Sequence, residues 1–222
     1  MVRKIGNRET DAILSDAELC DAAMGKPGVK DVRIISPSDV VTAAWVKLKW
    51  QFGCDGYGQC LVCPPFTPTA EQMRVVLDCY HRTILIHFGS RAAVKTVVAD
   101  LERDIFLSGA WKVFGLGAGP CYFCRKCPVE GRAFAAEVDP IVRGPYARTI
   151  TAESDPQALP EAPSAAPAAV EEGQCRHTER ARPSMEACGI DVFSTAKRAG
   201  FPIEVVRTRR QSPDYYGLIL VD

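Results

Sequence analysis

The sequence predicts an α+β or mixed α/β fold: a single domain with a mixed central sheet, flanking helices and cysteine-rich metal-binding loops. Three observations support this class. The chain has 222 residues, 47% hydrophobic and 24% charged, which is an ordinary balance for one globular domain. Its apolar residues follow a helical period in some segments and a strand period in others, without strict alternation of strand and helix. Six of its ten cysteines lie in two short segments.

The chain begins with a weakly predicted helix across Asp11 to Ala23, followed by a strand over 31–35, "DVRII". A second strand is expected over 44–50, because three apolar residues alternate with two lysines in "AWVKLKW". Thr69 and Gln72 have the form of a capping box, and apolar residues then follow at helical spacing. A helix from about 70 to 81 is therefore expected.

The middle of the chain adds three elements. "TILIHF" (83–88) is a short apolar strand. Apolar residues at helical spacing from Val94 to Ile105 predict a helix that ends near Gly109. The strand "WKVFGL" (111–116) then leads into a cysteine motif.

The last third opens with an expected insertion, 128–174. Within it, 156–170 has four prolines and six alanines in fifteen residues, a composition typical of a disordered loop. The insertion lies inside the domain, because regular patterning resumes after it. Asp191 is placed to cap a helix that stops at Gly200, and strands over 203–207 and 216–222 complete a set of about six strands and four helices.

Composition excludes several classes of function. With 27 basic and 27 acidic residues, the chain has no electrostatic footprint for nucleic acid. No apolar stretch has the length of a signal peptide or a membrane span, so we expect a soluble cytoplasmic protein without membrane or nucleic-acid partners. Cysteines in a reducing compartment bind metal or carry out redox chemistry more often than they form disulfides.

The segment "GPCYFCRKCP" carries Cys121, Cys124 and Cys127 in a C-x2-C-x2-C run followed by proline. Cysteines spaced in this way reach three irons of a cubane cluster, as in ferredoxins, with a fourth ligand from elsewhere. Cys175 is the nearest candidate downstream, and Cys188 is its rival. The long separation is no objection, because loop closure costs only about 0.6 kcal/mol per doubling of loop length.

A second group, Cys54, Cys60 and Cys63 in "FGCDGYGQCLVCPPF", has intervals of five and two. It is predicted to supply most of a second cluster or a ligand to the first; the alternative is a rigid Gly- and Pro-rich loop with inert cysteines. The first interval differs from the C-x3-C-x2-C arrangement of radical S-adenosylmethionine enzymes.

Zinc is the alternative metal, since it also accepts four thiolates, but its sites normally come as two separate C-x2-C knuckles. The isolated Cys20 and Cys79 are expected to be structural. "GLGAGP" (115–120) is not taken as a dinucleotide motif, because a proline and the cysteine run stand where the phosphate-binding helix should begin.

Several of these motifs together resemble the domain of unknown function 2284 family of metal-binding proteins, from about residue 30 onward. The motifs are Cys54-x-x-Tyr57-Gly58 with Cys63-Pro64-Pro65, then "AGPC" with the three clustered cysteines, then Cys175-Arg176 and "RPSMEACGIDVFST". The resemblance implies metal binding at Cys121, Cys124, Cys127 and Cys175, with Cys54 and Cys63 as a second pair. Cys60 and Cys188 are additions of this chain, as is the long stretch before Cys175. The family implies no reaction.

Three functional hypotheses follow. The first is a [4Fe–4S] electron-transfer protein or accessory subunit that serves a redox partner protein. The second is a redox enzyme whose substrate site lies near a second cluster at Cys54, Cys60 and Cys63. The third is a zinc-stabilised interaction module.

Charged and polar residues also lie near the cysteine motifs. Basic charge lies beside Cys175, on Arg176, Arg180 and Arg182. It would stabilise a reduced cluster or attract an acidic partner protein. The alternative is an ordinary solvent-exposed charged surface. His177 is expected to have a surface or supporting role. Three residues have side chains that can transfer protons: Tyr57, Ser184 and Glu186. The sequence shows no combination of nucleophile, base and orienting group, so no catalytic residue is predicted.

Overall fold

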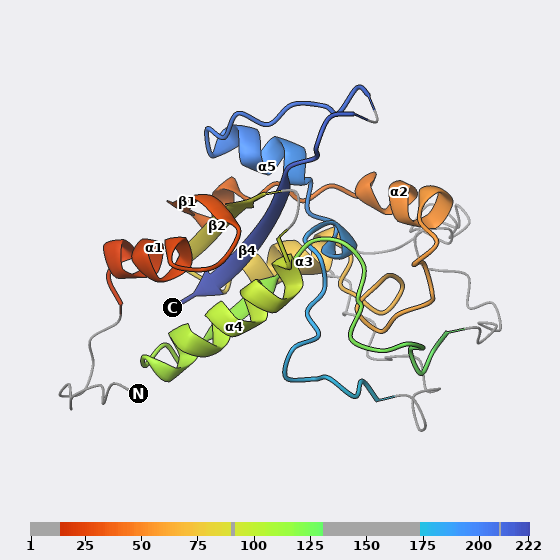
Figure 1. Ribbon diagram of the computed structural model, residues 1–222, viewed down its shortest axis with the longest axis horizontal. Helices are drawn as coiled ribbons and strands as arrows, with labels where there is room; N and C mark the ends of the chain where they lie inside the picture. The colour runs from red at the N-terminus through yellow and green to blue at the C-terminus, as the bar shows by residue number, and fades with distance from the viewer. Residues whose placement is uncertain (1–13, 90–91, 131–173, 209) are drawn as a thin grey trace, which may run out of the picture.

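A four-stranded antiparallel sheet forms the centre of the protein (Figure 1). The computed structural model describes residues 14–89, 92–130, 174–208 and 210–222. The strands lie in the order β1-β2-β4-β3, and their bounds are β1 Val29–Ile35, β2 Arg82–Phe88, β3 Val113–Leu116 and β4 Tyr215–Val221. The α+β class is therefore confirmed, but the sheet is wholly antiparallel rather than mixed.

Helices cover both faces of this sheet because its two central strands are apolar on both sides. Ile84 and Ile86 pack with α1 (Asp16–Met24) and α4 (Val94–Leu107). On the opposite face, Leu85 and Leu218 pack with residues of α3 (Ala70–Leu77) and α5 (Val192–Arg198). Figure 1 shows α4 and α5 on opposite sides of β4. The described residues also contain the short 3₁₀ helices η1 (Pro37–Asp39) and η3 (Glu186–Cys188).

Two glycines allow α4 to pack closely on the sheet. A Cβ on Gly115 would lie 2.5 Å from Cγ1 of Val98, and a Cβ on Gly217 would lie 2.8 Å from Cγ2 of the same residue. Such distances are shorter than real Cβ contacts, so a side chain at these places on β3 and β4 would force Val98 or the helix to shift. The close approach places the first turns of α4 beside the end of β3, where the cysteine loop begins.

The strand expected over 44–50 is wrong, because α2 (Val46–Gly53) occupies this segment. Val46 and Trp50 are buried, whereas Leu48 is 55% exposed. Residues four apart share a helix face, so these two buried residues fit a helix as well as a strand. The packing of Trp50 against Ala187 and Cys63 favours the helix.

The strand expected over 203–207 is also wrong. These residues have no regular secondary structure, and Val205 and Val206 are exposed. In the described chain they pair with no strand of the sheet, and of their apolar residues only Ile203 packs against the core. The other expected helices and strands are confirmed with small shifts at their ends, including the capping box of Thr69 and Gln72 and the Asp191 cap.

The predicted insertion lies almost entirely outside the described residues, and its Pro- and Ala-rich part, 156–170, does so completely. In the described parts of the chain, no helix has both the length and the apolar character needed to cross a membrane.

Candidate metal centre

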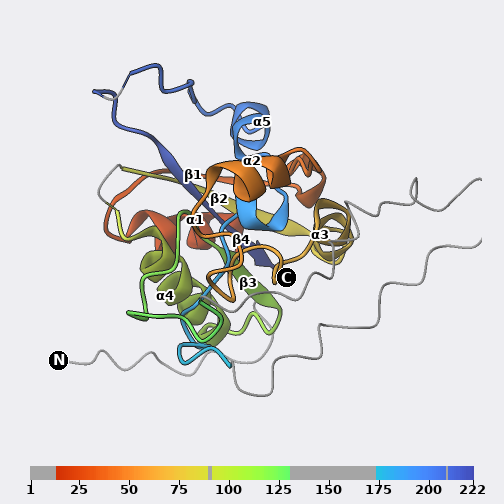
Figure 2. The same ribbon diagram turned by 90° about the vertical axis from the view of Figure 1, so that its right-hand side faces the viewer.

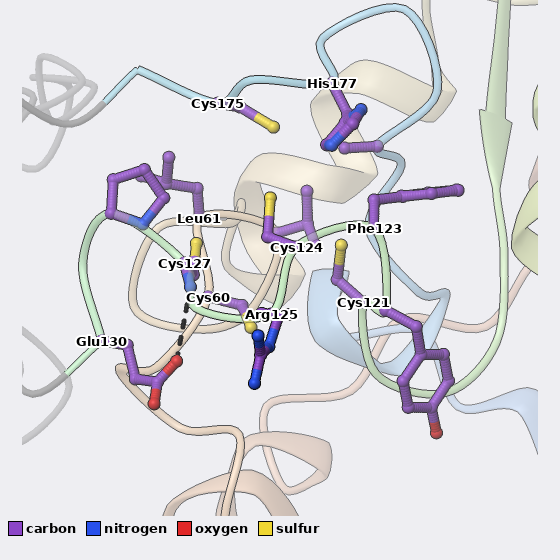
Figure 3. Close-up of a pocket in the computed structure, with 14 residues that line it drawn as sticks. Cys60, Leu61, Cys121, Phe123, Cys124, Arg125, Cys127, Glu130, Cys175 and His177 are labelled. Carbon is purple, nitrogen blue, oxygen red and sulfur yellow. Dashed lines mark hydrogen bonds between the residues drawn. The ribbon is translucent and has the colours of Figure 1, made fainter.

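Five cysteines line one cavity of about 290 Å³ (Figure 3): Cys60, Cys121, Cys124, Cys127 and Cys175. Three of them lie on the loop that follows β3, and Figure 3 shows their thiols on the same side of this loop. The thiol of Cys175 points toward them from a separate segment. The structure thus brings together all four cysteines of the predicted cluster set, and adds Cys60.

Backbone hydrogen bonds hold the two cysteine segments side by side. The N–H of Gly117 donates to the carbonyl of Pro183 at 2.8 Å, and the N–H of Met185 donates to the carbonyl of Gly117 at 3.0 Å. Gly117 is four residues before Cys121, and Pro183 is eight residues after Cys175. This contact brings the end of β3 against the Cys175 segment, although the predicted insertion separates them in sequence.

Buried ion pairing fastens the same segment to α4. The Glu102 carboxylate accepts hydrogen bonds from Arg182 Nε at 2.7 Å and from Arg182 Nη2 at 2.8 Å. It also accepts the backbone N–H of Gly115 at 2.9 Å. Arg180 pairs with Asp100 at 2.9 Å in a much more exposed position. Two of the three arginines beside Cys175 are therefore engaged with carboxylates, which leaves Arg176 as an exposed cation near the cavity.

The second cysteine group lies on the loop that follows α2, and its thiols lie close to one another. The thiols of Cys60 and Cys63 are near enough for each to influence the pKa of the other. A Cβ on Gly56 would lie 3.5 Å from Cys54 Sγ and 3.7 Å from Cys63 Sγ, so the missing side chain leaves space between these two sulfurs. Figure 2 shows this loop and the loop after β3 on the same side of the molecule.

Burial dominates the electrostatics of this second group. Desolvation, followed by the negative charge of neighbouring sulfurs, raises the pKa of Cys60 to about 12. Desolvation also raises the pKa of Cys63 to about 11, although the nearby Lys95 ammonium opposes this shift. Without a metal, both groups are thiols at neutral pH, and a bound metal would have to displace their protons.

The remaining cysteines lie away from the cavity. Cys188 is 1% exposed, packs in the core with Met185 and Ile190, and does not line the cavity. Cys20 is half-buried on α1. Cys79 is exposed, and its thiol donates to the carbonyl of Val75.

The polar residues near the cysteines have structural roles in the described chain. His177 lines the cavity, with Nδ1 3.7 Å from Glu179 Oε1. Ser184 is buried and accepts the N–H of Ala187. Tyr57 packs in the small cluster of Trp50 and Cys63. Burial raises the pKa of Glu186, which lines a separate cavity of about 180 Å³.

The donor set fits a metal that prefers sulfur. Thiolates select zinc, copper(I) and iron–sulfur clusters over hard cations such as magnesium or calcium. Among the residues that the structure describes, no three Cys, His, Asp or Glu side chains converge closely enough to hold a single metal ion. The cysteines therefore surround a space instead of meeting at one point.

Two buried charged residues of α4, Lys95 and Glu102, were not expected from the sequence. They are seven residues apart, and therefore lie on the same face of the helix as the buried Val98. Two charges of opposite sign on an apolar helix face are the signal that would have revealed them, since charged side chains are seldom buried without a partner.

The comparison with protein families gives a match to "Predicted metal-binding protein (DUF2284)" over residues 33–147 and 164–221. The chain belongs to this family. The resemblance drawn from the cysteine motifs is thus confirmed. Metal binding is the property that is predicted for this family. The gap inside the match, residues 148–163, falls within the predicted insertion. Searches of curated proteins and of solved structures found no match.

Proposed function

We propose that this DUF2284 protein holds a [4Fe–4S] cluster through Cys121, Cys124, Cys127 and Cys175 and exchanges single electrons with a partner protein. The observation that supports the proposal most directly is the gathering of these four cysteines around one cavity. The cavity of about 290 Å³ has room for more than a single ion, because one water molecule occupies about 30 Å³ of liquid. A tetrathiolate zinc site would instead bring its sulfurs to about 2.3 Å from one centre.

The side chains around the cysteines suit a redox centre that accepts or releases electrons at the surface. Apolar groups limit the access of water; they are Leu61, Val62, Phe123, Pro128 and Ala181. The backbone N–H of Cys127 donates to the Glu130 carboxylate, which holds the last turn of the loop. When bound, a cluster supplies one-electron chemistry, and the protein's part is to ligate it, shield it and set its potential.

The mouth of the cavity supports a partner that is itself acidic. Exposed cations stand around it on both cysteine segments, namely Arg125, Lys126 and Arg176, beside the exposed ring of Tyr122. Complementary charge of this kind accelerates encounter and orients two proteins, without contributing much to affinity. An acidic electron carrier fits these residues.

A second candidate function is a redox enzyme with a further metal site at Cys54, Cys60 and Cys63. The observation that favours it is the position of Cys60, which lines the same cavity as the four proposed ligands. A site with three cysteine ligands would leave one coordination position open to a substrate.

Metal and sulfide analysis of anaerobically purified protein tests both proposals. About four irons and four sulfides per chain are expected for one cubane, and they should be lost in Cys124→Ser but retained in Cys79→Ser, which alters an exposed thiol remote from the cavity. About eight irons, falling to about four in Cys63→Ser, would indicate a second cluster and favour the enzyme. Zinc without sulfide would contradict both and support a zinc-stabilised interaction module.

A further inference from the structure

A lysine is buried beside the cysteine loops. Lys95 lies in the first turn of α4 and is 7% exposed. Its Nζ donates to the backbone carbonyl of Arg182 at 2.7 Å. A neutral carbonyl satisfies one donor of the ammonium but does not balance its charge, and an unbalanced buried charge is costly.

No carboxylate balances this ammonium within the described parts of the chain, where Lys95 appears in no salt bridge. The nearest acidic residue along the same helix face, Glu102, is already engaged by Arg182 and by the N–H of Gly115. Among the described residues, a counter-charge for Lys95 therefore has to come from a group other than a carboxylate.

Sulfur atoms of both cysteine loops lie near enough to Lys95 for their charge to act on it. Burial lowers the pKa of Lys95, and negative charge on Cys63, Cys121, Cys188 and Cys60 opposes this effect. The hydrocarbon stem of Lys95 also packs against Gly117, since a Cβ there would lie 3.0 Å from Lys95 Cγ. Lys95 thus stands where α4, the end of β3 and the two cysteine loops meet.

We propose that Lys95 is the buried counter-charge of the thiolate centre and that its ammonium raises the reduction potential of the bound cluster. This inference rests on the proposed function, because it requires a cluster on Cys121 and its neighbours. Reduction adds one electron, and hence one negative charge, to a centre that is already anionic. A fixed positive charge favours the reduced form, and burial protects this interaction from screening by water and salt.

The chain contains a matched exposed lysine. Lys126 lies between Cys124 and Cys127 on the cluster loop, but its side chain is exposed to solvent. Water screens an exposed charge far more than a buried one. Removing the charge of Lys126 therefore measures the effect of a nearby but screened cation.

The test is a redox titration of the anaerobically purified full chain, followed by absorbance and electron paramagnetic resonance. Two neutral variants are compared with the wild type: Lys95→Met, and Lys95→Gln, which keeps a donor for the Arg182 carbonyl. Both are expected to lower the ratio of reduced to oxidised cluster at a fixed potential about tenfold, equivalent to about 59 mV for one electron. Lys95→Arg should retain most of the wild-type potential, and Lys126→Met should shift it much less.

The outcomes separate this inference from the proposed function. An intact cluster with an unchanged potential in Lys95→Gln would overturn the inference while leaving the cluster assignment in place. An equal shift in Lys126→Met would overturn it as well, because burial would then make no difference. Absence of a cluster from the wild-type protein would contradict the proposed function, and this inference with it. Iron and sulfide content, measured on every variant, identifies which of these has occurred.

Discussion

At the scale of single residues, Glu102 connects three parts of the protein. Its carboxylate lies on α4, accepts two hydrogen bonds from Arg182 near the Cys175 segment, and accepts the N–H of Gly115 on β3. The side chains of Glu102 and Arg182 are 11% and 15% exposed. A pair buried to this degree contributes little when intact, but the loss of one partner leaves the other charge unbalanced.

Glu102→Ala is therefore expected to lower the free energy of unfolding by about 3–5 kcal/mol, because Arg182 would be left as a buried, unpaired cation. Asp100→Ala provides the control, since it removes the exposed partner of Arg180 and should cost about 0–1 kcal/mol. Urea denaturation followed by circular dichroism measures both values. Equal losses in the two variants would show that the burial of the Glu102 pair is unimportant.

At the scale of elements, the contact of α4 with β3 and β4 sets the position of the cysteine loop. Glycine at 115 and 217 permits the approach, and Val98 fills the space on the helix side. The end of β3 then meets Lys95 through Gly117. A change in the distance between helix and sheet would move both the loop and its buried cation.

Gly115→Ala is expected to destabilise the protein by about 1–3 kcal/mol, since the added methyl group would overlap Val98. Gly53→Ala is the matched control, because a Cβ at the end of α2 meets no atom within 4 Å. Thermal unfolding of both variants, together with the Gly115→Ala/Val98→Ala double variant, measures the effect. Partial recovery in the double variant is expected, and additive losses would contradict steric overlap as the cause.

At the scale of the whole molecule, one polar contact ties the loop before β4 to the neighbouring strand β2 and to the edge strand β1. Asp214 Oδ1 lies 2.8 Å from His87 Nε2 on β2 and 3.3 Å from Lys30 Nζ on β1. Burial alone would raise the pKa of Asp214, but the hydrogen bonds from His87 and Lys30 outweigh it and hold the pKa below its usual value. The ionised carboxylate therefore stabilises the folded state.

This contact predicts a pH dependence of stability. Because the folded pKa of Asp214 is depressed, its contribution is present above the pKa of the unfolded chain, about 3.9, and is lost as the pH falls through the folded value. The difference in thermal midpoint between the wild type and Asp214→Asn should be largest near pH 5 and shrink toward pH 2.5. A difference that stays constant over this range would show that ionisation of Asp214 does not contribute.

The sequence by itself determined the features that depend on neighbouring residues. Caps at Thr69 and Asp191 and the apolar runs of β2 and β4 could be recognised, because cap chemistry and side-chain period act over a few residues. The cysteine spacing likewise pointed to metal binding, and the family match agrees with it.

Tertiary structure decided everything that depends on residues far apart in the chain. Val46 and Trp50 suit either a strand or a helix, and only the packing of Trp50 on Ala187 and Cys63 selects the helix. Cys60 joins the cavity, and Cys188 enters the core, through contacts between segments that spacing does not encode. The burial of Lys95 near the cysteine loops has the same origin. Its environment is created by a helix, a strand end and two loops that meet only in the folded chain.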